Sequence, residues 1–240
     1  MEYGPNTPRT MTRAQAEAAQ IDVGLRRYML QVYNYMASGI ALTGICAYLT
    51  ASSPTFLQAI YGTPLMWVVM LAPLAAVFFL SFKINSIKFS TAQAIFWVYA
   101  ALMGLSLASI FLVYTGTSIA RVFFITAGTF GAMSLYGYTT KRDLSQFGSF
   151  LFMGLIGIVL ASIVNIFLGS TMLQFAISVI GVLVFTGLTA YDTQRIKELY
   201  SEIDDSEIYG KKALMGALTL YLDFINLFIM LMQLLGNRRD

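Results

Sequence analysis

The sequence contains no histidine and a single cysteine, Cys46. Zinc, copper and haem sites are built mainly on histidine and cysteine, so the sequence disfavours these three kinds of metal centre. The absence of histidine also disfavours Ser-His-Asp and Cys-His catalytic groups, and one cysteine cannot form an internal disulfide. The chemistry of this chain therefore depends on side chains that carry oxygen.

Charge is also scarce. Only 11% of the residues are charged and 58% are hydrophobic, and the mean hydropathy is +0.70. This composition is typical of a membrane protein and not of a soluble domain. Apolar runs of about 20 residues predict seven transmembrane helices, which lie roughly at 29–50, 65–82, 92–114, 119–139, 147–168, 172–191 and 213–235.

We therefore expect an all-α membrane protein with one seven-helix transmembrane domain at residues 28–236. A cytoplasmic N-terminal segment (1–27) precedes this domain and a short tail (237–240) follows it. Residues 9–29 are rich in Ala, Gln and Arg, which fits either a short helix at the membrane surface or a frayed tail. The first apolar run is too long for a signal-peptide core and has no evident cleavage site, so we expect it to remain in the mature protein.

Basic residues occur in every second connection between the predicted helices. They are Arg9, Arg13, Arg26 and Arg27 before the first helix, Lys83 and Lys88, Lys141 and Arg142, and Arg195, Lys197, Lys211 and Lys212. The opposite connections have none, although Arg121 lies just inside the fourth helix. This asymmetry predicts a cytoplasmic N-terminus. It also accounts for the net charge of +3, so we expect no nucleic-acid partner.

An odd number of helices places the C-terminal residues Arg238 and Arg239 on the outer side, against the same rule. Either the tail tolerates this exception, or the last segment re-enters the membrane and returns to the cytoplasm. We favour seven true transmembrane helices.

The last apolar run, "LTLYLDFINLFIMLMQLLG", contains one acid, Asp223, near its middle. Asp223 belongs to a set of six residues that follow one another at alternating spacings of three and four and therefore lie on one helical face. They are Gly216, Thr219, Asp223, Asn226, Met230 and Gln233. A polar stripe of this length should avoid lipid, so we expect this helix at the centre with the other six around it. An intramembrane acid indicates a functional site. The alternative is a protonated Asp223 that Asn226 and Thr219 hold as a structural contact.

One further acid, Asp192 in "FTGLTAYDTQRIKELY", lies at the end of an apolar run and not in a loop. The structural alternative for Asp192 is a solvated ion pair with Arg195 at the membrane surface.

The motifs "GALTLYLDFINLFIMLMQLLG" and "GLTAYDTQRIK" resemble the signature of the bacterial branch of the Bax inhibitor-1 family, also called the transmembrane Bax inhibitor motif family. "VYNYMASGIALTG" and "TKRDLS" are similar to that family as well. The resemblance implies a seven-helix bundle with a central last helix. It also implies a pH-sensitive calcium leak channel in which Asp192 and Asp223 form a hydrogen-bonded sensing pair. The resemblance further matches Lys83 to a basic residue that latches the closed state, although Lys makes a weaker latch than Arg.

Two neighbouring carboxyls in a low dielectric should share a proton and titrate as a unit. Calcium takes about six to eight oxygen ligands, so Asp192 and Asp223 would form only a weak, transient site, with Asn226, Thr219 and Gly216 as supporting pore-facing residues. We expect calcium as the transported ion and no tightly bound cofactor. The helix rise places Asp223 about 15 Å deep and Asp192 near the surface, so their pairing rests mainly on the resemblance, and helix tilt would have to bring them together.

Three other functions remain open. They are a proton-coupled carrier of a small solute, a regulatory membrane protein that acts through partners, and an intramembrane aspartyl protease. The protease is disfavoured because "LYLD" lacks glycines around the second acid and the Pro-Ala-Leu signature is absent, so we expect no enzyme. The expected partners are the lipid bilayer, calcium ions and protons, and protein partners are unknown. We expect a bacterial inner membrane, because no cleaved presequence or ER-retrieval tail is evident.

Overall fold

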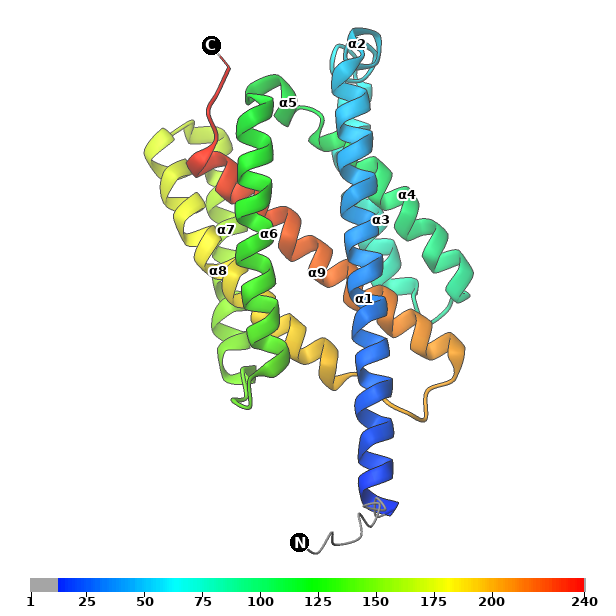
Figure 1. The fold of residues 1–240 in the computed structure, drawn as a ribbon. Coiled ribbons are helices and arrows are strands. Elements are labelled where there is room, and N and C mark those ends of the chain that lie inside the picture. The colour runs from blue at the N-terminus through cyan, green and yellow to red at the C-terminus, as the bar shows by residue number, and fades with distance from the viewer. Residues whose placement is uncertain (1–12, 240) are drawn as a thin grey trace, which may run out of the picture.

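The computed structural model describes residues 13–239, and their side chains from residue 21 onward. This part of the chain forms nine helices and no sheet (Figure 1). The helices are α1 (Arg13–Ser52), α2 (Pro54–Tyr61), α3 (Leu65–Lys83), α4 (Phe89–Leu107), α5 (Ile110–Val113), α6 (Gly116–Thr139), α7 (Ser145–Leu168), α8 (Thr171–Glu198) and α9 (Ser206–Leu235). A helix pairs its backbone groups internally, which a bilayer demands of any spanning segment.

Seven segments are long and apolar enough to cross a membrane, which confirms the predicted all-α membrane fold. Six are α1, α3, α6, α7, α8 and α9, and the seventh combines α4 and α5 as Phe89–Val113. α1 extends without interruption from Arg13 into the first span. Residues 13–27 are therefore not a separate surface helix, and residues 1–12 lie outside the described part.

The last helix is the most buried of the seven, as its polar stripe predicted. In its most apolar window, 67% of the α9 residues are buried, compared with 11–33% in the other spans. α9 packs against α8, α1, α6 and α4. The expectation that all six other helices surround α9 needs correction, because α3 packs on α4 and α7 packs on α8 in outer positions.

The third span is interrupted between α4 and α5, and one side chain compensates for the break. The Tyr61 hydroxyl lies 2.7 Å from the Leu105 carbonyl oxygen and 3.0 Å from that of Ser106, and it accepts a hydrogen bond from Ser109 N at 3.2 Å. These are backbone groups that the break removes from the helical ladder. The break is therefore tolerated in an apolar setting because Tyr61 supplies the missing partners.

The two ends of the described chain lie at opposite ends of the bundle (Figure 1). The segment after α9 pairs with residues near α5 and α6: Thr115 N donates to Asn237 O at 3.1 Å, and Arg239 N donates to Val113 O at 2.9 Å. α9 thus crosses the whole bundle, and the re-entrant alternative is wrong. Arg121, the exception to the charge pattern, donates to the Leu235 carbonyl oxygen at 3.3 Å. Leu235 is the last residue of α9, and a positive charge is stabilising at the C-terminus of a helix.

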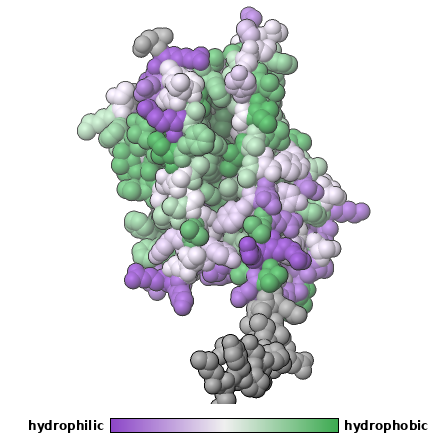
Figure 2. Space-filling view, in the orientation of Figure 1, coloured by the Kyte–Doolittle hydropathy of each residue, from purple (hydrophilic) through white to green (hydrophobic). Residues whose placement is uncertain are grey.

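Figure 2 shows hydrophobic residues as a broad band across the face formed by α1 and α6, with hydrophilic residues gathered mainly toward the lower end. Lys and Arg lie at this lower end in the connections or in the helix ends beside them: Lys83 and Lys88 between α3 and α4, Lys141 and Arg142 between α6 and α7, and Arg195, Lys197, Lys211 and Lys212 in the ends of α8 and α9. We call it the basic end.

Candidate functional site

Asp192 and Asp223 meet in one cavity, although 30 positions separate them in the sequence. The cavity has a volume of about 510 Å³ and lies between α7, α8 and α9. Asp192 projects into it from α8 and Asp223 from α9, and the two carboxyl groups lie close enough to interact directly. Asp223 is only 5% exposed, and its Oδ2 atom is buried without a partner in the described structure.

The orientation of α9 explains how Asp223, which the residue count places deep in the membrane, lies beside Asp192, which the count places near the surface. Figure 1 shows α9 crossing the bundle obliquely, from the basic end on the side of α4 to the opposite end beside α6. Because a tilted helix gains less depth per residue, Asp223 reaches the level of Asp192 despite the longer count along the chain.

The stripe on α9 faces α8 along its length. A Cβ atom on Gly216 would lie 2.9 Å from Ile196 Cγ2, and the Met230 side chain fills the space beside Gly181. Further along, Ser178 Oγ donates to Gln233 Oε1 at 2.6 Å. Small and polar residues therefore let α8 and α9 approach closely, and the cavity with the two acids opens within this interface.

The supporting residues differ from the prediction in two respects. Thr219 and Asn226 line the cavity, but they donate to carbonyls of their own helix, at Met215 O (3.1 Å) and Leu222 O (2.8 Å). Neither donates to Asp223, so the structure shows no hydrogen bond from Thr219 or Asn226 that holds this acid. Gly216 packs against Ile196 and does not line the cavity.

The cation at this site is Arg195, whose side chain lines the cavity together with both acids. Its spacing of three residues from Asp192 on α8 is the sequence signal for this position. Lys83, the predicted latch, is exposed at the end of α3 and does not line the cavity. Its latch role stays a prediction.

The arrangement can hold a proton or bind a cation weakly. A hydrogen bond between two carboxyl groups requires at least one proton, because an ionised carboxylate only accepts. Within residues 13–239, no group of three or more His, Cys, Asp or Glu side chains comes close enough to hold a metal ion. The cavity instead offers two carboxyls with the side-chain oxygens of Thr219 and Asn226, which is a sparse ligand set for calcium.

Comparison with known proteins supports the resemblance in the sequence. The profile of the family described as "Inhibitor of apoptosis-promoting Bax1" matches residues 25–240. The chain is 53% identical to the protein RP147 of Rickettsia prowazekii over 219 residues, which cover 91% of this chain and 93% of that protein. It is 52% identical to the inner membrane protein YbhL of Escherichia coli, over 90% of this chain and 94% of YbhL. A membrane protein of Streptococcus pyogenes, SpyM3_0260, is 37% identical, with 91% and 96% covered. This integral membrane protein therefore belongs to the Bax inhibitor-1 family.

Proposed function

We propose that this protein is a calcium leak channel whose opening depends on protonation of the Asp192–Asp223 pair. The observation that carries the proposal is the convergence of these two acids, from two different helices, in one cavity. We further propose that it resides in a bacterial inner membrane with a cytoplasmic N-terminus, as the name of YbhL and the positions of Lys and Arg suggest.

Protonation acts on the contact between α8 and α9. With a shared proton, the carboxyls attract each other and hold the two helices together. When the proton leaves, two negative charges remain in a poorly solvated place and repel each other. The pair then separates or accepts a cation, and calcium, which prefers oxygen ligands, fits this demand. A site with few ligands releases its ion readily, which conduction requires.

The decisive experiment measures calcium flux from proteoliposomes between about pH 5 and about pH 8, a range that spans loss of a shared proton. We expect native flux to change across this range. Asp223→Asn and Asp192→Asn each replace a carboxyl with a neutral group of the same shape, which mimics the protonated state. Each variant should therefore keep, at all pH values, the flux that the native protein has at its acidic limit.

Asp22→Asn is the matched control, because Asp22 is exposed on α1 and lies outside the cavity. This variant should keep the native pH profile. A native flux that is absent, or that both cavity variants leave unchanged, would refute the leak channel. The three other functions, a carrier, a partner-binding protein and a protease, would then be favoured over the leak channel.

A second prediction concerns the cation at the site. Arg195 lines the cavity and competes with calcium for the carboxylates. Arg195→Gln should therefore raise calcium flux several-fold at pH values where the pair is ionised.

Lys83→Gln, which removes a charge at the same end of the bundle but outside the cavity, tests the predicted latch directly. If only Lys83→Gln raises flux, the latch is Lys83 and not Arg195.

A further inference from the structure

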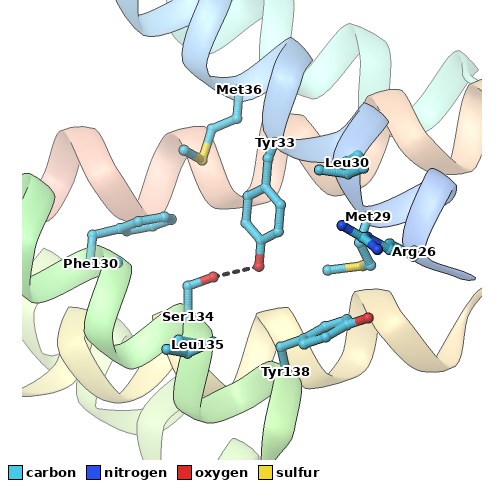
Figure 3. Close-up of a pocket in the computed structure, with 10 residues that line it drawn as sticks. Arg26, Met29, Leu30, Tyr33, Met36, Phe130, Ser134, Leu135 and Tyr138 are labelled. Atoms are coloured by element: carbon cyan, nitrogen blue, oxygen red, sulfur yellow. Dashed lines mark hydrogen bonds between the residues drawn. The ribbon is translucent and has the colours of Figure 1, made fainter.

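A second cavity lies on the face formed by α1 and α6, away from the two acids. Its volume is about 590 Å³. Figure 3 shows its walls, with α1 on one side and α6 on the other. The lining residues are Arg26, Met29, Leu30, Tyr33, Met36, Phe130, Gly131, Ser134, Leu135 and Tyr138. We call this cavity the α1–α6 groove.

The groove has one charged residue, and it lies at one extreme. Arg26 is exposed at the basic end of α1, whereas the walls beyond it are mainly Met, Leu and aromatic side chains (Figure 3). From Arg26 to Met36 the helix rises about 15 Å, which is half of a hydrocarbon core of about 30 Å. The groove therefore has the depth of one leaflet, with a cation at the level of the lipid headgroups.

The hydroxyl groups of Tyr33 and Ser134 in the wall are already paired, in a chain of hydrogen bonds that continues to Thr193 behind them. Thr193 donates its hydrogen to the Thr189 carbonyl oxygen at 2.7 Å, so Ser134 must be the donor in its 3.0 Å bond to Thr193. Tyr33 must then donate to Ser134 at 2.6 Å (Figure 3). None of these three hydroxyls has a donor left for an occupant, so this part of the wall suits an acyl chain better than a polar solute.

From this geometry we propose that the α1–α6 groove binds an anionic phospholipid of the leaflet at the basic end. The phosphate contacts Arg26, and one acyl chain lies along Met29, Met36 and Phe130. Basic pockets between transmembrane helices recognise anionic headgroups in this way. The single cation at the mouth favours an anionic lipid over an apolar transmembrane helix of a partner, which would bring no negative charge to Arg26.

Native mass spectrometry tests the proposal. The full chain in detergent is mixed with phosphatidylglycerol or with phosphatidylcholine, and the bound lipid is measured. We expect the native chain to retain phosphatidylglycerol preferentially. Arg26→Gln should reduce this preference about five-fold, the effect of one basic residue near a lipid surface. Arg27→Gln is the matched control, because Arg27 is also exposed but does not line the groove, and it should change nothing.

A second pair of variants tests the acyl chain. Gly131 lines the groove with open space around its Cβ position, so Gly131→Leu should fit the fold and fill the groove. It should lower retention of both lipids. Gly128 also has open space beside it but does not line the groove, so Gly128→Leu should retain lipid as the native chain does.

Equal retention of both lipids by the native chain, or equal effects of the two arginine variants, would overturn the proposal. It would also fail if Gly131→Leu left lipid bound and instead removed a dimer from the spectrum, because the groove would then bind a second copy. Thermal unfolding of each variant distinguishes loss of lipid from loss of fold.

Discussion

At the scale of single residues, Gly104 determines how closely α4 approaches α1. A Cβ atom at this position would lie 2.6 Å from the Thr43 carbonyl oxygen and 2.6 Å from Cys46 Cβ. Gly104→Ala should therefore force the two helices apart and lower the free energy of unfolding by about 1–3 kcal/mol. Thermal unfolding in detergent measures this effect.

Gly157→Ala provides the comparison, since Gly157 also lies within a helix but has no atom within 4 Å of its Cβ position. This substitution should be neutral or slightly stabilising, because Ala favours a helix more than Gly does. Equal destabilisation by both variants would show that the close approach at Gly104 is not the cause.

At the scale of elements, the connection between α6 and α7 is attached to α8 by one side chain. Gln194 accepts a hydrogen bond from Leu144 N and donates one to Arg142 O, both at 2.8 Å. Gln194→Leu keeps the size but leaves two backbone groups without these partners, which should cost about 1–3 kcal/mol. We expect faster trypsin cleavage after Lys141 and Arg142, measured by limited proteolysis.

Gln146→Leu is the control for this connection, because Gln146 is exposed near the start of α7 and the same change there removes no buried contact. Cleavage of this variant should proceed at the native rate. If Gln194→Leu is cleaved no faster than Gln146→Leu, the loop does not depend on Gln194.

At the scale of the whole molecule, seven crossings place the two termini on opposite sides of the membrane. With the N-terminus cytoplasmic, we expect an N-terminal fluorescent fusion to be bright and a C-terminal alkaline phosphatase fusion to be active, because the phosphatase works only outside the cytoplasm. Reporters on the same side would contradict the seventh crossing, and reversal of both would contradict the inference from Lys and Arg.

The spanning helices and the central position of the last helix could be predicted from the sequence. A bilayer forces each spanning backbone to pair within its own helix, so apolar runs such as Ser145–Leu168 are enough to locate helices. The stripe through Asp223 similarly required a protein environment, which α9 has. Both inferences depend on local pattern and on the solvent, and neither requires knowledge of which helices touch.

Only the tertiary structure shows what depends on tilt and on distant partners. The oblique course of α9 brings Asp223 to Asp192. The tilt angle of α9 cannot be calculated from residue spacing, because packing against neighbouring helices sets it. The same reason explains why Tyr61 at the broken span and the α1–α6 groove were not predicted, whereas the spacing of Arg195 from Asp192 on one helix was enough to place these two side chains together. The sequence by itself determined a membrane protein of seven helices with two candidate acids, and the packing decided which side chains meet.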